Sequence, residues 1–112
     1  MSKTIYKYKL NILEPTVITG RIDKFISVQY QNTTKSIVAW AIVDDKLDNK
    51  DYVVWSFGTG HKLPKFLTAD DFIGTVQLYS GETILHFFAT EIKSESGREN
   101  VKEWNEEFEL GM

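Results

Sequence analysis

The chain has 112 residues, which is enough for one domain with one hydrophobic core and too few for two. Its 42% hydrophobic and 13% aromatic content excludes a disordered chain. The absence of cysteine excludes a disulfide scaffold, a thiol nucleophile and a thiolate zinc site. A formal net charge of −3 argues against a nucleic-acid polymer as partner. The sequence contains neither a membrane-length apolar run nor a secretory signal, so we expect a cytoplasmic protein with no membrane partner.

The predicted elements in the first third of the chain are strands with one solvated face. Residues 4–10 alternate, with Tyr6, Tyr8 and Leu10 on one face and lysines on the other, which indicates an edge strand. Residues 17–19 form a short predicted strand that ends at Gly20. The alternation of residues 25–31 predicts another strand, whose inward side chains are Ile26, Val28 and Tyr30.

The middle of the chain is more uniformly apolar. Residues 36–43 are nearly all apolar and include β-branched and aromatic residues, which predicts a buried strand. We interpret the polar residues 44–51 as a hairpin turn that leads into a strand at residues 52–57. Farther on, Thr68 is predicted to cap a short helical turn, with Asp70 and Asp71 near its N-terminus.

The clearest hairpin joins residues 72–79 to residues 83–92 through a three-residue turn with a central glycine. Together these elements predict a mainly β protein with six to seven strands. We expect a single antiparallel β-sandwich or small open barrel over residues 1–92, followed by an acidic helical extension over residues 93–112.

The extension differs from the domain in charge and in periodicity. It carries six glutamates against three basic residues, whereas residues 1–92 carry ten acidic and ten basic side chains. Ser96 and Glu99 have the spacing of a capping box, and Val101, Trp104 and Phe108 then form one apolar helix stripe. The stripe is predicted either to pack on the sheet or to dock on a second subunit or a partner, and we expect a homo-oligomer.

The candidate ligand-binding segment consists of Gly58, Thr59, Gly60, His61 and Lys62. Two glycines expose backbone N–H groups, and a hydroxyl, an imidazole and an ammonium stand beside them, a combination suited to a small anionic ligand. The alternative is a strand-connecting turn in which the glycines supply positive φ angles. The segment lacks the spacing of a Walker loop and of a dinucleotide fingerprint.

The sequence matches none of the catalytic or metal-binding motifs considered below. His86 lies among apolar strand residues, where a cross-strand histidine with a satisfied nitrogen is the usual role. His61 and His86 have neither the His-x-His nor the His-x-x-x-His spacing of a metal site. The chain has no Gly-x-Ser-x-Gly elbow, and its Asp pairs fall in predicted turns. We therefore assign no catalytic residue, no metal and no cofactor, although a hydrolase that uses both histidines remains an alternative.

Several segments resemble one small family of bacterial and bacteriophage proteins, defined by a domain of unknown function (DUF7352). The similar segments are Ile5–Tyr8, Ser27–Asn32, Trp40–Asp44, Phe57–His61 and Phe72–Leu78, with Gly81 and His86–Phe88 downstream. The resemblance covers residues 3 to about 90, and the extension after residue 92 departs from the family pattern. It implies a phage or prophage setting in a host cytoplasm and no biochemical activity. It also implies that the Gly-Thr-Gly-His turn is a family hallmark.

These observations lead to two functional hypotheses. The first is a non-catalytic phage-type protein that captures a small, nucleotide-like anion at residues 58–62, for instance as a sponge for a host immune signal. The second is a protein-interaction module that inhibits a host protein through its acidic C-terminal helix.

Overall fold

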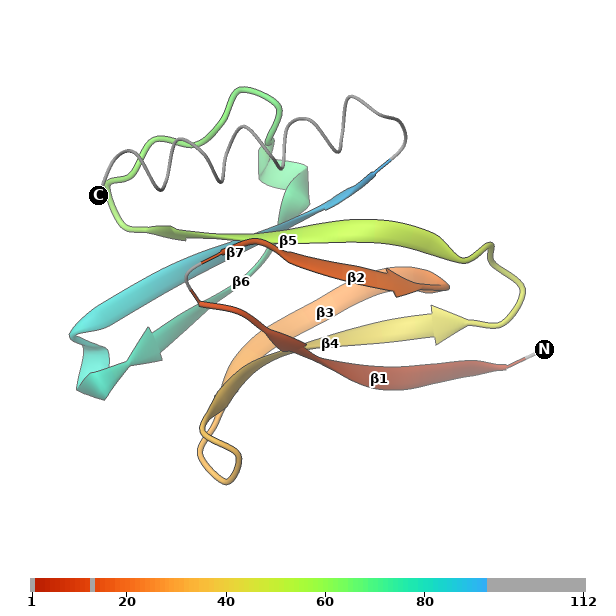
Figure 1. Cartoon of the computed structure of the whole chain (residues 1–112), viewed down its shortest axis with the longest axis horizontal. Helices are drawn as coiled ribbons and strands as arrows, with labels where there is room; N and C mark the ends of the chain where they lie inside the picture. Colours follow the sequence, from red (N-terminus) through yellow and green to blue (C-terminus); the bar gives the residue numbers. More distant parts are fainter. Residues whose placement is uncertain (1, 13, 93–112) are drawn as a thin grey trace.

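The computed structural model describes residues 2–12 and 14–92 of the chain. Seven strands lie within these residues (Figure 1), together with two short 3₁₀ turns, η1 (Ala69–Asp71) and η2 (Tyr79–Gly81). The strands are β1 (Lys3–Leu10), β2 (Thr16–Gly20), β3 (Ile22–Gln31), β4 (Ser36–Asp44), β5 (Lys50–Gly58), β6 (Phe72–Leu78) and β7 (Thr83–Glu91). The mainly β prediction is confirmed.

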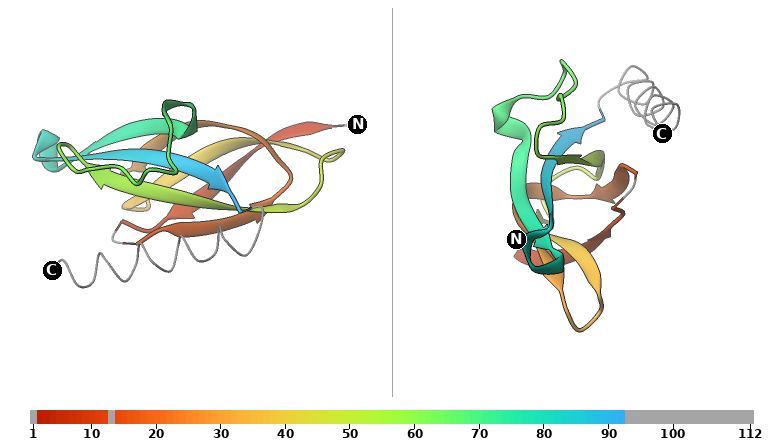
Figure 2. Two further views of the ribbon diagram at one scale, coloured as in Figure 1. Left: turned by 90° about the horizontal axis from the view of Figure 1, so that it is seen from above. Right: turned by 90° about the vertical axis from the view of Figure 1, so that its left-hand side faces the viewer.

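The strands form two antiparallel sheets that lie one on the other (Figure 2). The three-stranded sheet has the order β1-β4-β3, and the four-stranded sheet has the order β2-β5-β7-β6. Among the described strands no pairing joins one sheet to the other, so the fold is a sandwich rather than a closed barrel. The predicted hairpin of residues 72–92 is confirmed by the antiparallel pairing of β6 with β7.

The main core lies between the sheets and takes residues from all seven strands. Ala39 and Ala41 on the central strand β4 are completely buried, and Phe87 of β7 is one of the largest buried side chains in the same core. The other buried members are Leu10, Ile18, Ile22, Val28, Ile37, Val54, Val76 and Leu78. Burial of this apolar surface is the principal stabilising contribution to the sandwich.

A second apolar cluster covers the outer face of the four-stranded sheet. It consists of Val53, Trp55 and Phe57 of β5, Phe88 of β7 and Leu67 of the connection between β5 and η1. The connection returns over the sheet, and Phe66 places its ring 5.2 Å from that of Trp55. Because successive residues of β5 face opposite clusters, both faces of this strand are buried from Val53 to Trp55, which explains its apolar run Tyr52–Trp55.

The edge strands β3 and β6 approach each other closely. A Cβ atom placed on Gly74 of β6 would lie 3.1 Å from the backbone nitrogen of Val28 on β3, so glycine is needed for this approach. Register shifts occur in both strands, between Ile22 and Lys24, between Phe25 and Ser27, and between Phe72 and Gly74. These bulges bend the two strands near the point where the sheets meet.

Two predictions about the strands are wrong. Residues 44–51 do not form a hairpin turn, because β4 and β5 belong to different sheets and the segment crosses between them. Ile26 and Tyr30 are 42% and 41% exposed rather than buried, whereas Val28 is buried as expected. Ile26 is exposed because it lies within a bulge of β3. Tyr30 is exposed because it lies near the β3–β4 turn, which projects beyond the four-stranded sheet (Figure 1).

The predicted cap at Thr68 is confirmed. The Asp71 carboxylate accepts hydrogen bonds from the backbone N–H of Thr68 (2.8 Å) and from its hydroxyl (3.3 Å). The predicted C-terminal helix, with Val101, Trp104 and Phe108, lies outside the described residues. Within the described part of the chain, no helix has the length and apolar character needed to span a membrane.

Candidate functional site

The candidate segment forms a tight turn at the end of β5. The backbone N–H of His61 donates to the carbonyl oxygen of Gly58 at 3.2 Å, which closes the turn. Gly60 has a φ of +89°, a left-handed conformation that side chains with a Cβ adopt at a cost, so this glycine has a backbone role. The turn reverses the chain so that Phe66 and Leu67 reach the outer face of β5.

The structure brings a hydroxyl of this turn to His86 of β7. Thr59 Oγ1 lies 2.8 Å from His86 Nε2, and Thr75 Oγ1 of β6 lies 3.0 Å from His86 Nδ1. The strand pairing explains this placement, because His86 is directly opposite Phe57 on one side and Thr75 on the other. A neutral imidazole donates to one hydroxyl and accepts from the other, so both ring nitrogens are satisfied.

His61 lies apart from this hydroxyl–imidazole group. Its ring packs against Gly58, where a Cβ atom would be only 3.2 Å from His61 Cε1. The histidine is exposed, as is Lys62, and no hydrogen bond between described residues joins His61 to His86. Within the described part of the chain, no group of three His, Asp or Glu side chains is arranged to hold a metal ion.

Sequence reasoning missed Thr75 as a neighbour of the candidate turn. It placed His86 on a strand with a cross-strand partner, and the structure adds that two hydroxyls from different segments bind its ring. The alternation of apolar and polar residues along 72–78 and 83–92 indicates which residues share a face of each strand. The register that places Thr75 opposite His86 depends on how the two strands pair in the folded protein.

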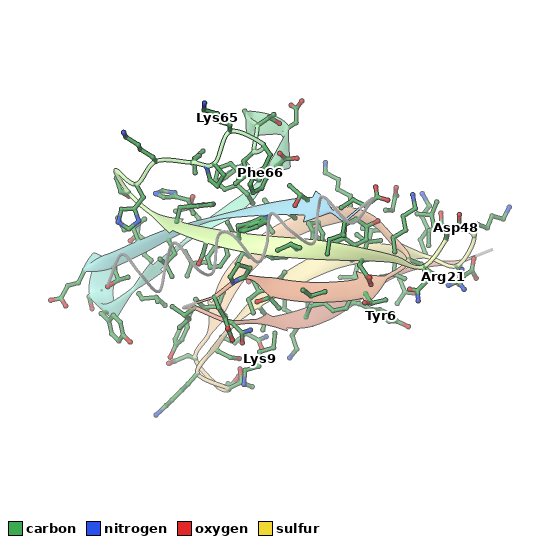
Figure 3. All side chains as sticks on the ribbon, turned by 45° about the horizontal axis from the view of Figure 1, so that its top comes forward. Tyr6, Lys9, Arg21, Asp48, Lys65 and Phe66 are labelled. Carbon is green, nitrogen blue, oxygen red and sulfur yellow. The ribbon has the colours of Figure 1, made fainter. Side chains whose placement is uncertain are left out.

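The segment that follows β5 is cationic and contains no carboxylate. Residues 57–68 include His61, Lys62 and Lys65, while the nearest acidic residues along the chain are Asp51 and Asp70. Figure 3 shows Lys65 and Phe66 on the connection above the four-stranded sheet, on the opposite side of the molecule from Lys9 of β1. The local charge therefore favours an anion, although the domain as a whole is neutral.

Two cavities that lie among the described residues have linings that do not include residues 58–62. One has a volume of about 590 Å³ and is lined by rings that include Phe25, Tyr52, Phe66 and Phe72. The other has a volume of about 320 Å³ and lies beside residues 46–48. Residues 59–62 of the candidate turn are exposed to solvent.

Comparison with protein families gives a match to the model described as Domain of unknown function (DUF7352), which covers residues 1–98. The chain belongs to the DUF7352 family. The match includes every described strand and the candidate turn, and it extends farther than the predicted limit near residue 90. No curated protein and no solved structure matches the chain.

The Thr59–His86–Thr75 arrangement of this DUF7352 protein has two chemical capacities. A hydroxyl that accepts a hydrogen bond from the His86 ring keeps its own hydrogen, which it can donate to an anion. Alternatively, a hydroxyl hydrogen-bonded to an imidazole that is oriented by a third group is the geometry of an activated nucleophile. In this protein the third group is the neutral hydroxyl of Thr75, which stabilises an imidazolium less than a carboxylate does. Binding is therefore the better-supported chemistry.

Proposed function

We propose that this DUF7352 protein is a non-catalytic binding protein that captures a small, nucleotide-like anion at residues 58–62. The site is extended by Thr75 and His86, which sequence reasoning did not include. The observation that carries the proposal is the Thr59–His86–Thr75 group, which adjoins a cationic segment without carboxylates.

The proposed contacts follow from the chemistry of each group. His86 would donate to one of the hydroxyls of Thr59 and Thr75, and that hydroxyl would donate its own hydrogen to a phosphate oxygen. Lys62 and His61 are exposed and would contribute charge or hydrogen bonds from the side of the turn. In the phage setting that the sequence resemblance implies, such a protein would act as a sponge for a host immune signal.

Nuclear magnetic resonance titration of the full chain with adenosine monophosphate tests this proposal, with adenosine as the uncharged control. We expect saturable shifts of the amides of residues 58–62 with the nucleotide and weaker shifts with adenosine. Thr59→Val removes the hydroxyl and is expected to weaken nucleotide binding about tenfold. Thr34→Val, on the distant β3–β4 turn, is the matched control. Equal affinity of the two variants for the nucleotide would reject the assigned site.

A second candidate function is inhibition of a host protein through residues 93–112. These residues carry the entire net charge of −3, and the family match ends at residue 98, within this segment. Deletion of residues 93–112 is expected to abolish capture of the host partner while circular dichroism still reports a β protein. Retained capture would reject this function, and retained nucleotide binding by the same variant would separate the two proposals.

A further inference from the structure

The larger cavity opens at the end of the sandwich where β3 and β6 begin. Its walls come from the first residues of β3 and β6, from Tyr52 of β5, from the last residues of β7 and from Phe66. A volume of about 590 Å³ is within the range of small-molecule sites in proteins. The cavity is separate from the turn at residues 58–62, so an inference from it does not depend on the function proposed above.

The walls of the cavity are held by contacts that join the two sheets. The Tyr52 hydroxyl donates to the carbonyl oxygen of Ile22 at 3.3 Å, and the rings of Tyr52 and Phe25 meet edge to face at 5.9 Å. The bulges of β3 and β6 flank the same opening, and such bulges are frequent beside functional sites. The cavity is therefore preformed by the fold.

Two aromatic rings at the cavity are incompletely buried. Phe72 is 47% exposed and Phe66 is 39% exposed, although both rings also contact the apolar cluster on the outer face. Exposed phenyl rings that line a cavity provide an apolar surface on which a ligand can gain contact area. Their faces also carry negative electrostatic potential, which attracts cations.

Carboxylates outnumber basic groups in this lining. Asp23, Asp70, Asp71 and Glu91 line the cavity together with a single basic residue, Lys24. Lys3 lies 3.5 Å from Asp23, and Lys50 lies 3.3 Å from Glu91, so these two carboxylates are paired.

The other two carboxylates differ in their partners. Asp71 accepts hydrogen bonds from Thr68, which still leaves its negative charge uncompensated. Asp70 is exposed and forms no ion pair with a described residue. A positively charged ligand would gain favourable Coulomb energy here, whereas an anion would be repelled.

We infer that this cavity binds a small organic cation, in which an ammonium group is attached to an apolar or aromatic body. The body packs against Phe66 and Phe72, and the ammonium group lies near Asp70 and Asp71. The ligand class is thus opposite in charge to the anion proposed for residues 58–62. The DUF7352 domain would thus have one site that prefers anions and another that prefers cations.

The test compares three probes that share a phenyl body and differ in charge. Phenethylamine, 2-phenylethanol and 3-phenylpropionate are titrated separately into the full chain, and amide shifts are followed by nuclear magnetic resonance. We expect saturable shifts with the amine at residues 22–25, 70–73 and 89–91, weaker shifts with the alcohol and none with the carboxylate. The inference is overturned if the alcohol binds as tightly as the amine, or if the amine gives no saturable shift below about 10 mM.

Two substitutions separate the charge of the cavity from its apolar wall. Asp70→Asn is expected to weaken amine binding about threefold. Phe72→Leu is expected to weaken binding of both amine and alcohol about threefold, because both lose contact with the phenyl ring. Glu14→Gln removes one exposed carboxylate outside the cavity and is the matched control for charge. Equal amine affinity of Asp70→Asn and Glu14→Gln would contradict the inference, since Asp70 is exposed and its substitution leaves the fold intact.

Discussion

Gly74 and Gly20 illustrate how the surroundings of a single residue decide the cost of a change. A Cβ atom on Gly74 would lie 3.1 Å from the backbone nitrogen of Val28, and the backbone of a paired strand cannot move without disturbing its sheet. A Cβ atom on Gly20 would lie 2.9 Å from the Tyr8 hydroxyl oxygen. That oxygen is at the end of a rotatable side chain, which can move aside. Alanine at position 20 is therefore expected to destabilise the protein less than alanine at position 74, although its Cβ contact is closer.

We predict that Gly74→Ala lowers the free energy of unfolding by about 1–3 kcal/mol, the range for overpacking in a core. Gly20→Ala is expected to cost less than half as much, because only the Tyr8 side chain must adjust. Urea denaturation of both variants measures the difference. Equal costs would show that the approach of β3 to β6 does not depend on glycine.

Among the elements, the connection between β5 and β6 has the largest structural consequence. In the sheet order β2-β5-β7-β6, β7 lies between β5 and β6, so the connection must pass over β7. The turn at Gly58–His61 starts this path, and Leu67 anchors it in the outer apolar cluster with 8% of its surface exposed. The turn therefore has a structural role, because it starts this path. Its exposed side chains stay available to a ligand.

Truncation of the connection tests this anchoring. Leu67→Ala is expected to lower the free energy of unfolding by about 2–4 kcal/mol, because it leaves a cavity against Trp55 and Phe88. Phe66→Ala should cost less, since Phe66 is 39% exposed. Thermal and urea denaturation provide the comparison, and a larger loss for Phe66→Ala would contradict the assigned order of burial.

At the scale of the whole molecule, Tyr52 makes contacts that join the two sheets. It belongs to β5 of the four-stranded sheet and donates its hydroxyl hydrogen to Ile22 of β3 in the three-stranded sheet. Burial raises the pKa of Tyr52 above its ordinary value of 10.0, and the nearby Glu91 carboxylate adds to this effect while Lys50 opposes it. The folded protein therefore favours the neutral phenol.

The raised pKa predicts a loss of stability in alkali. Below pH 10.0 the phenol is neutral in both states, and its stabilising contribution is fully present. As the pH rises from there through the folded-state pKa, the unfolded chain loses its proton first, so the free energy of unfolding falls. Burial also raises the pKa of Tyr8, which contributes in the same direction.

Urea denaturation at about pH 8 and about pH 11 measures this fall. Tyr52→Phe is expected to show a smaller difference between the two pH values, because the titrating hydroxyl is removed. Tyr79→Phe, which changes a 73% exposed ring at the β6–β7 turn, is the control and should behave as the unmodified chain. An unchanged alkaline loss in Tyr52→Phe would show that other groups cause it.

Local sequence patterns determined the β class, most strand positions, the cap at Thr68 and the hairpin of residues 72–92. These features follow from period-2 alternation and from turn residues, which act over a few neighbouring positions. The same patterns placed a turn with donor side chains at residues 58–62. The family followed instead from the resemblance of particular segments, and the family match confirms it.

The tertiary structure decided which strands pair and which side chains meet. The segment 44–51 crosses between sheets, and only the placement of β5 against β7 brings Thr59 to His86, 27 residues away in the sequence. The cavity between β3, β5, β6 and β7 likewise joins segments that are distant along the chain. Alternation assigns a residue to a face of its strand, but the neighbours of that strand are selected by long-range packing, which no local pattern encodes.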